Sequence, residues 1–367
     1  MNWKKVLLAF LVVSTLGAIY PQVTDDSLIW KHLQADFRLD HQVNTNPSVR
    51  VQRDWYVANS THLEIILERS SPFLYLIVEE LERRNMPGEL ALLPVIESSY
   101  DPNAYSHSHA AGLWQMIPST GRNYGLEQNN WYDGRRDIYA STHAALDYLE
   151  KLNKQFKGDW PLTIAAYHAG EGNISRAIAS NKALGKPADV WSIFMAKPET
   201  RGYVQRFLAL SDVIKHAHKY GVNLPEIPNE PAVILVKLNK QIDLNRAASL
   251  AGISINELYA YNPGFINRTI RSTPPDGPHH LLLPITSVKP LTKRLAALDI
   301  TRFSMWDSIG GEIVAVSEKY RVQTGDTLGT IAQKHDTSIG EIRDANQLKS
   351  DIILVGQRLV IPESEQA

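Results

Sequence analysis

The sequence predicts an α+β multidomain protein in which an α-rich domain is followed by two small β-α-α-β units. Three observations carry this prediction. Apolar residues recur at helical spacing between residues 70 and 220, where no run alternates as a strand would. Three prolines, Pro225, Pro228 and Pro231, then mark a boundary. Beyond them, two segments repeat each other at a constant offset.

The N-terminus predicts export. The basic start Met1–Lys5 precedes the uncharged run VLLAFLVVSTLGAI, residues 6–19. This order is typical of a secretory signal peptide, and the run is shorter than the ~18–20 residues that span a bilayer comfortably. Residues 1–20 are therefore predicted to be a signal peptide or, alternatively, a retained membrane anchor. The rest of the chain is expected in the periplasm or cell envelope.

The composition excludes several classes of function. The formal net charge is −1, with 38 Lys and Arg against 39 Asp and Glu, so we expect no nucleic-acid partner. The chain has no cysteine, which excludes disulfides, thiolate chemistry, Cys-ligated zinc and lipid attachment at cysteine. No cofactor is predicted. His107 and His109 lie two residues apart without an H-E-x-x-H pattern, so no metal site is expected either.

Caps and breakers delimit the expected helices of the α-rich domain. Ser71 and Pro72 predict a helix start, because serine favours the N-cap and proline the first turn. The sequence NMPG at 85–88 predicts its end. By the same criteria we expect further helices over 89–98, after the cap Asp137, from Trp160 to Gly170, and over 199–220, where Gly221 closes the last one.

The C-terminal part contains an internal repeat. The segment LNRAASLAGISINELYAYN (244–262) aligns with LGTIAQKHDTSIGEIRDAN (328–346) at an offset of 84 residues. Each copy follows a short apolar strand, VILVKL or YRVQ, and precedes another that ends in proline, HHLLLP or QRLVIP. This shared order predicts two β-α-α-β units, at 232–286 and 319–363.

The second unit resembles a LysM module. The resemblance rests on the TGDTL start at 324–328, an asparagine before a loop, Gly356-Gln357 and the closing Ile361-Pro362. LysM modules bind chitin-like or peptidoglycan sugars through N-acetylglucosamine. The resemblance implies glycan contacts at Gly325, Asp326, Thr327, Leu328 and Asn346. The first unit has Gln241-Ile242-Asp243-Leu244 instead of the Gly-Asp-Thr-Leu start, and we interpret it as a degenerate LysM-like unit.

The α-rich domain resembles the lytic transglycosylases with a goose-type-lysozyme-like fold (the SLT domain), and among them the membrane-bound lytic murein transglycosylase D group. The resemblance covers residues 27–222, with a motif core at 85–185. It rests on five pieces in order: PGELALLPVIESSYDPNAYS, AAGLWQMIPSTGRNYGL, WYDGRRDIYASTHAALDYL, GDWPLTIAAYHAGEGNISRAI and ETRGYVQRFLAL. The chain departs from the group at His168, where Ala-Tyr-Asn-Ala-Gly is usual. Members are also often lipoproteins, which a chain without cysteine cannot be.

Glu97 is the candidate catalytic residue. It follows the apolar run Ala91–Ile96. The residues alone leave two interpretations open: an exposed glutamate at a helix end, or a carboxyl in an apolar pocket whose raised pKa would let it donate a proton near neutral pH. The resemblance implies the second. A single glutamate would protonate the MurNAc–GlcNAc β-1,4 bond and then accept the C6 hydroxyl proton, which gives a 1,6-anhydromuramoyl product.

Other residues are candidates for supporting roles. Ordinary glycosidases use two carboxylates, but the acidic residues near the motifs are typical of turns and caps: Asp101, Glu127, Asp133, Asp137 and Glu171. The resemblance implies substrate contacts by Ser98, Ser106, Gln115, Tyr167 and His168. The alternatives are internal hydrogen bonds for Ser106 and Gln115 and a core position for the Tyr167 ring. Trp114, Trp131 and Trp160 are expected in the core.

The sequence as a whole predicts a peptidoglycan lytic transglycosylase that binds glycan strands. Two alternatives stay open: a muramidase that uses water in place of the C6 hydroxyl, and a non-catalytic wall-binding protein. Glu97-Ser98 together with GLWQ favours an enzyme over the second alternative. A titrating His168 would make activity fall below about pH 6.5, where a histidine acquires charge.

Overall fold

The computed structural model describes residues 27–193, 198–237, 243–267, 280–288, 290 and, with short gaps, 313–361. The predicted signal peptide or anchor at residues 1–20 lies outside these ranges, as does Gln241-Ile242. Within them, no helix combines the length and the apolar character needed to cross a bilayer.

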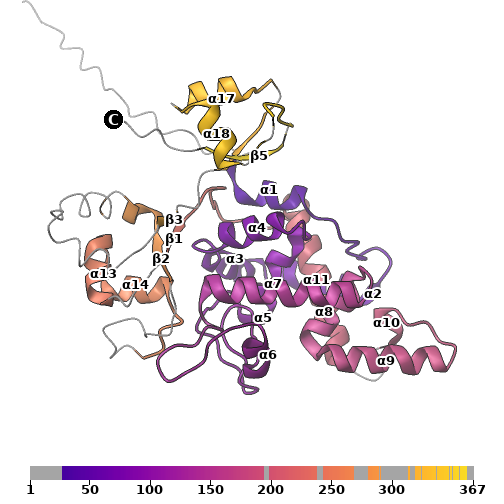
Figure 1. Ribbon diagram of the computed structural model, residues 1–367. Coiled ribbons are helices and arrows are strands. Elements are labelled where there is room, and N and C mark those ends of the chain that lie inside the picture. The colour runs from indigo at the N-terminus through magenta and orange to yellow at the C-terminus, as the bar shows by residue number, and fades with distance from the viewer. Residues whose placement is uncertain are drawn as a thin grey trace, which may run out of the picture.

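Helices build the N-terminal part of the molecule, drawn from indigo to pink in Figure 1. Helix α11 packs against α2 and α8, and α7 packs against α8 and α4. The α-rich domain of the prediction is thus confirmed. In chain order the elements are α1 (Ile29–Ala35), α2 (Pro47–Ala58), α3 (Ser60–Arg69), α4 (Leu74–Arg83), the 3-10 helix η2 (Gly88–Leu92), α5 (Leu93–Ser98), α6 (Pro118–Asn123), α7 (Ile138–Gln155), α8 (Trp160–Ala169), α9 (Glu171–Ala183), α10 (Val190–Ile193), α11 (Pro198–Lys215) and α12 (Ala217–Tyr220).

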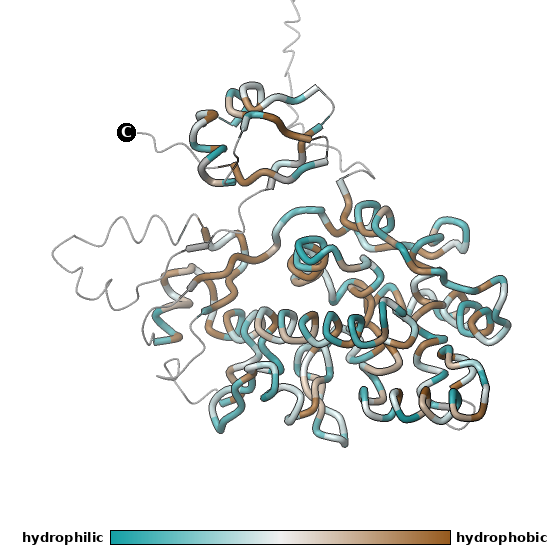
Figure 2. The backbone as a smooth tube through the Cα atoms, turned by 45° about the vertical axis from the view of Figure 1, so that its right-hand side comes forward, coloured by the Kyte–Doolittle hydropathy of each residue, from teal (hydrophilic) through white to brown (hydrophobic). Residues whose placement is uncertain are grey.

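One hydrophobic core holds these helices together. Leu67, Leu74, Ile77, Leu149 and Phe207, which come from the four helices α3, α4, α7 and α11, are completely buried in it. Each buried aliphatic side chain contributes about 1.5–3 kcal/mol relative to exposure. In Figure 2 hydrophobic segments gather inside the helical domain and along the strands that follow it.

Pro94 explains why the helix that carries Glu97 is short. A proline has no N–H to donate to the carbonyl four residues earlier, and it is tolerated only in a first helical turn. The expected helix over 89–98 is accordingly split into η2 and α5, with Pro94 in the first turn of α5. The left-handed backbone of Ser99 (φ 53°) ends α5 directly after Ser98. Glu97 therefore lies in the last turn of a short helix that has Pro94 in its first turn and ends at Ser99.

Two helix boundaries differ from the prediction. Helix α4 begins at Leu74 rather than at Ser71, because residues 70–73 form the turn out of α3 and Ser70 provides the carbonyl that Leu74 N–H binds (2.8 Å). The helix expected over 199–220 is interrupted at His216 (φ −117°), whose ring contacts Asp212 one turn earlier. The caps Asp137 and Gly221 were predicted correctly: Asp137 accepts from Ala140 N–H, and Gly221 (φ 66°) ends α12.

Two β-α-α-β units follow the helical domain, as the repeat predicts. The first contains β1 (Val233–Lys237), α13 (Leu244–Ala251), α14 (Ile255–Tyr261) and β2 (His280–Pro284), with β1 antiparallel to β2. The second contains β4 (Lys319–Arg321), α17 (Leu328–Lys334), α18 (Ile339–Ala345) and β5 (Arg358–Val360), with β4 antiparallel to β5. A short strand that the sequence did not suggest, β3 (Ile313–Val314), adds to the other edge of β1.

The same asparagine closes both units. In the first, the Asn262 amide donates to Leu282 O (2.7 Å), and its carbonyl accepts from Leu282 N–H (2.8 Å). In the second, the Asn346 side chain makes the matching pair with Val360, at 2.7 Å in both directions. Each asparagine thus joins the end of the second helix to the last strand, as a backbone partner would.

Candidate active site

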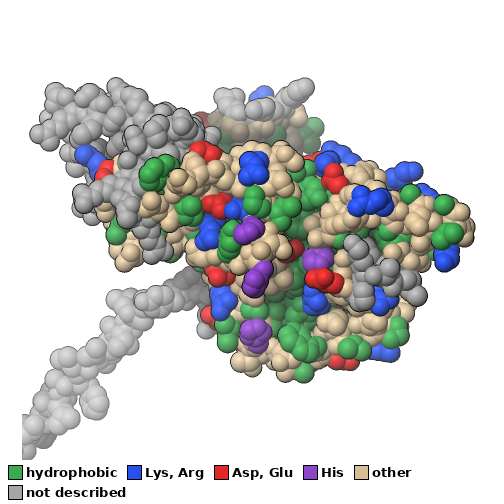
Figure 3. Space-filling model, turned by 90° about the horizontal axis from the view of Figure 1, so that it is seen from below, with side chains coloured by type: hydrophobic (Ala, Val, Ile, Leu, Met, Phe, Trp, Pro, Cys, Tyr) green, Lys and Arg blue, Asp and Glu red, His purple; other side chains and the backbone are tan. Residues whose placement is uncertain are grey.

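Glu97 lies beside Tyr203, which comes from a different helix more than 100 residues later in the chain. The Tyr203 hydroxyl donates to Glu97 Oε1 at 2.5 Å. Glu97 remains partly accessible, whereas Tyr203 is 2% exposed. Figure 3 views the molecule from the side on which α5, α6 and α9 lie in Figure 1; this face is hollowed, with hydrophobic side chains along the hollow.

The protein around Glu97 makes it a weak acid. Burial of the carboxyl raises the pKa of Glu97 from its usual 4.5 to about 7, because the anion loses hydration there. Two groups oppose this shift: the Tyr203 hydrogen bond and the positive charge of Arg206, one helical turn further along α11. The carboxyl can therefore hold a proton near neutral pH and also release it, which an acid–base catalyst requires.

Tyr203 was not among the residues that the sequence motifs singled out. Its only signal was the motif ETRGYVQRFLAL, which places a tyrosine early in a long helix without showing which face it occupies. The contact with Glu97 depends on how α11 crosses α5, and no local pattern contains that information. Burial, followed by the charge of Glu97 and the hydrogen bond to it, raises the pKa of Tyr203 well above its usual range, so the phenol stays protonated as a donor.

His168, the residue that departs from the related motif, packs on Tyr203. The two rings are nearly parallel (11°), with centroids 4.2 Å apart. Burial lowers the pKa of His168 below 6.5; Arg206 acts in the same direction, and Glu199 opposes it. The imidazole is thus neutral at neutral pH and packs on one face of the Tyr203 ring.

Tyr167 lies near Glu97 but does not bind it. Its hydroxyl donates to the Trp114 carbonyl at 2.8 Å, and burial, together with the Glu97 charge, raises the pKa of Tyr167. Ser98, the next residue after Glu97, donates to the carbonyls of Leu113 (2.9 Å) and Pro94 (3.1 Å). Of these two predicted contact residues, Ser98 therefore joins α5 to the loop around residue 114, and Tyr167 joins α8 to the same loop.

Ser106 and Gln115 stabilise the loop between α5 and α6. The Ser106 hydroxyl accepts from Ala110 N–H (3.0 Å), and the Gln115 amide donates to the carbonyls of Gly112 (2.9 Å) and Ala104 (3.3 Å). Gln115 also has a left-handed backbone (φ 45°). These are the internal hydrogen bonds of the alternative interpretation; both side chains remain partly accessible.

Each candidate for a second carboxylate has a structural partner. Asp133 pairs with Arg135, and Asp137 caps α7 and contacts His280. Asp101 accepts from Asn103 N–H in a turn, Glu127 accepts from Asn129, and Glu171 pairs with Lys151. Among the residues that the structure describes, each of these five carboxyl groups therefore has its own partner, and none is an unpartnered second acid beside Glu97.

The tryptophans and histidines divide between core and surface. Trp114 is fully buried and donates to Thr142, and Trp160 packs partly buried against the core. Trp131 is 47% exposed, so the expectation of a core position was wrong for it. It belongs to the loop 128–133, in which residues 129–131 are exposed and the buried Tyr132 pairs with Phe265 of the first β-α-α-β unit. His109 bonds Tyr105, and within the described residues no group of three His, Asp or Glu has the arrangement of a metal site.

The residues for which glycan contacts were predicted in the second unit have local roles. Asp326 accepts from Tyr320 (2.7 Å) and from Gln323 N–H (2.6 Å), and Thr327 caps α17. Leu328 is buried, Gly325 has a positive φ (95°), and Asn346 holds β5. Their side chains shape the unit, and Gly325 and Thr327 remain exposed.

Three protein families match successive parts of the chain. The Transglycosylase SLT domain matches residues 75–190. The family described as "Lytic transglycosylase MltD, LysM-like domain" matches residues 232–300, and the LysM domain matches residues 320–362. The three regions occur in the order that the sequence predicts.

The chain is also similar to individual proteins and to a solved structure. The chain is 38% identical over 345 residues to membrane-bound lytic murein transglycosylase D of Escherichia coli, covering 94% of this chain and 75% of that protein. It is 50% identical over 119 residues to a protein of Alteromonas sp. named for tributyltin chloride resistance, covering 32% of this chain and 58% of the relative. An inactive mutant of the lytic transglycosylase Slt from Pseudomonas aeruginosa aligns with a TM-score of 0.32 at 24% identity, over 41% of this chain and 25% of that one. By its similarity over nearly its whole length, this chain belongs to the membrane-bound lytic murein transglycosylase D family.

Proposed function

We propose that this chain is a peptidoglycan lytic transglycosylase in which Glu97 is the only acid–base catalyst. One observation carries the proposal: a partly accessible carboxyl with a pKa of about 7 accepts a hydrogen bond from a buried tyrosine, in a domain of the SLT family. The partners found for the other five acidic candidates support a single catalyst.

The proposed reaction uses the two protonation states of Glu97 in turn. The protonated carboxyl gives its proton to the oxygen that links MurNAc to GlcNAc, and the C–O bond breaks. The carboxylate then accepts the proton of the muramoyl C6 hydroxyl, whose oxygen bonds to C1 and closes the 1,6-anhydro ring. The proton count balances without water, and a pKa close to 7 serves both steps. The Tyr203 hydroxyl donates to Oε1 and stabilises the carboxylate between the two steps.

The C-terminal units are proposed to hold the enzyme on its substrate. We divide the chain into a catalytic domain at 27–222, a degenerate LysM-like unit at 232–286 and a LysM domain at 319–363, with glycan contacts in the last around Gly325–Leu328. Binding to the glycan mesh raises the effective concentration of the catalytic domain at nearby bonds, to the order of millimolar for short connections.

The chain acts in the cell envelope according to this proposal. The membrane-bound relative of Escherichia coli supports an envelope location. Residues 1–20 would direct export, and their apolar run at 6–19 would either be removed or retain the enzyme at the membrane.

Mass spectrometry of muropeptides released from purified sacculi tests the reaction. We expect anhydromuropeptides from the wild type. Products heavier by one water, with a reducing end, would identify a muramidase. No release by a folded protein that still binds sacculi would identify a non-catalytic wall-binding protein.

A further inference from the structure

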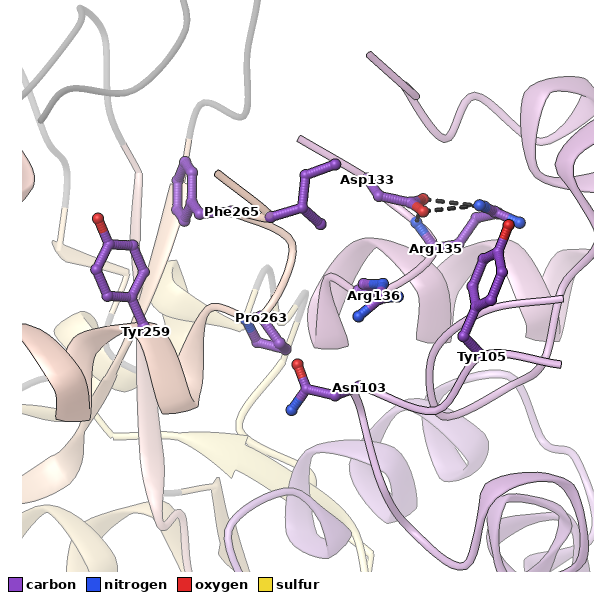
Figure 4. Close-up of a pocket in the computed structure, with 9 residues that line it drawn as sticks. Asn103, Tyr105, Asp133, Arg135, Arg136, Tyr259, Pro263 and Phe265 are labelled. Atoms are coloured by element: carbon purple, nitrogen blue, oxygen red, sulfur yellow. Dashed lines mark hydrogen bonds and ion pairs between the residues drawn. The ribbon is translucent and has the colours of Figure 1, made fainter. Parts of the chain in front are cut away.

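A second hollow lies between the catalytic domain and the first β-α-α-β unit. Its volume is about 410 Å³. Figure 4 shows Asn103 and Tyr105 on the side of the catalytic domain and Tyr259 and Phe265 on the side of the unit, with Arg136 between the two walls. None of these residues has a role in the chemistry proposed for Glu97.

Main-chain contacts fix the two walls relative to each other. Asp133 N–H donates to Gly264 O (2.8 Å), and Ile266 N–H donates to Trp131 O (3.1 Å). Gly264 is required at this crossing, because a Cβ there would lie 2.6 Å from the Tyr132 ring. Nearby, His280 of β2 pairs with Asp137 at the start of α7 (2.9 Å). The hollow is therefore formed before any ligand arrives, which reduces the entropy cost of binding.

Arg136 is a cation without a counter-charge in this hollow. Its neighbour Arg135 is satisfied by both oxygens of Asp133, at 2.9 and 2.7 Å. Within the described chain Arg136 forms no ion pair, and its Nε is buried without a hydrogen-bond acceptor. Its guanidinium lies 5.7 Å from the centroid of the Tyr105 ring. A buried unpaired donor is costly, and a carboxylate that reached it would form a strong charge-assisted bond.

The rim of the hollow supplies apolar contact. Tyr105 is 55% exposed and Ile266 is 43% exposed, on opposite walls. Tyr105 belongs to the loop that Ser98, next to Glu97, binds through the Leu113 carbonyl. The loop that forms this wall is thus attached to the residue that follows Glu97. A cation beside aromatic and aliphatic faces suits a ligand with an acid group on a sugar or peptide.

We infer that this hollow binds a carboxylate borne by a muramoyl residue of the glycan strand, with Arg136 as its partner and Tyr105 and Ile266 packing on the adjoining sugar or peptide. The inference rests on the proposed function, since it concerns another residue of the same substrate strand. The carboxylate has two sources: the peptide stem, or the lactyl group of a strand whose stems have been removed.

The test compares steady-state release of anhydro products from two substrates by the full-length chain. One is a set of linear strands with peptide stems, and the other is the same strands after an amidase has removed the stems. We expect Arg136→Ala to raise KM about tenfold with kcat unchanged, the size of one charge-assisted contact in a partly open site. Ile266→Glu, which puts a carboxylate on the opposite exposed wall, should do the same. The control Arg50→Ala removes an exposed arginine from α2 and should change neither constant.

Each outcome decides something. If the variants raise KM only for strands with peptide stems, the ligand of Arg136 is the stem carboxylate. If they raise KM only for strands without stems, the ligand is the lactyl carboxylate. Equal rises for both substrates mean that the hollow accepts either carboxylate. An unchanged KM in a folded Arg136→Ala or a folded Ile266→Glu variant overturns the inference. So does an equal loss of affinity for an uncharged N-acetylglucosamine oligomer, measured by tryptophan fluorescence. Failure of the proposed function is distinct, because the wild type itself would then release no anhydro product.

Discussion

The Tyr203 hydroxyl donates to Glu97 Oε1, and this bond joins the last turn of α5 to α11 across the catalytic domain. The bond stabilises the carboxylate, whereas burial of the same group destabilises it. Burial is the larger effect, so the pKa of Glu97 rises to about 7. In the proposed mechanism, the balance between these two influences sets the pH range of the activity.

Tyr203→Phe should move the basic limb of the pH profile upward. Without the hydroxyl, the anion of Glu97 loses its hydrogen bond while burial stays, so the pKa of Glu97 rises further. We also expect kcat to fall by about 10–100-fold, because the carboxylate of the second step is less stable and less well oriented. The measurement is kcat/KM for release of anhydro products between pH 5 and 9. A basic limb that stays in place or moves downward would show that Tyr203 does not act on the acidity of Glu97.

His168→Asn tests the ring that packs on Tyr203. Because burial holds the pKa of His168 below 6.5, the imidazole becomes charged only at a lower pH than the sequence alone suggests. A cation there would favour the Glu97 anion and lower the pKa of Glu97, so that less of the enzyme holds the proton needed for the first step. The wild type should therefore lose activity at a lower pH than a histidine of ordinary pKa would cause. The asparagine variant should keep activity further into the acid range, with kcat/KM at pH 7 changed by less than about tenfold.

His107→Asn is the matched control for that experiment, because His107 is an exposed histidine of the loop between α5 and α6. It should leave the acidic limb where it is in the wild type. Identical acidic limbs in all three proteins would assign that limb to a group other than His168.

Glu97→Gln should stabilise the fold at alkaline pH. The pKa of Glu97 is raised in the folded state, so the folded protein is penalised once this carboxyl ionises. The penalty is absent below about pH 4.5, grows as the pH rises towards 7, and is complete above it. Urea unfolding at pH 8 should show a gain on the order of 1–3 kcal/mol for the variant, which disappears near pH 4.5. A gain of equal size at both pH values would point to packing instead of ionisation.

The order of the elements could be predicted from the sequence because it is encoded locally. Glu97 was singled out by the family motifs, since the residues around it leave two interpretations open. Caps such as Asp137, the proline boundary and the repeat at an offset of 84 depend on residues close together in the chain. The helix start at Leu74 was missed because Ser70, and not Ser71, supplies the turn into it.

The surroundings of Glu97 depend on packing and could not be predicted in the same way. Tyr203 is 106 residues away and reaches Glu97 only through the crossing of α11 and α5. The hollow around Arg136 is formed by two parts of the chain about 130 residues apart, and its existence depends on how Gly264 meets Tyr132. Neither relation leaves a periodic pattern in the sequence.

The most direct test of the central claim is the rate of anhydromuropeptide release by Glu97→Gln, beside Glu127→Gln and Glu171→Gln as matched controls. A glutamine keeps the size of the side chain but can neither donate the proton nor accept it. We expect a loss of about 10²–10⁴-fold for Glu97→Gln, with sacculus binding retained and both controls close to the wild type. Anhydro products from Glu97→Gln at the wild-type rate, or an equal loss in either control, would contradict it.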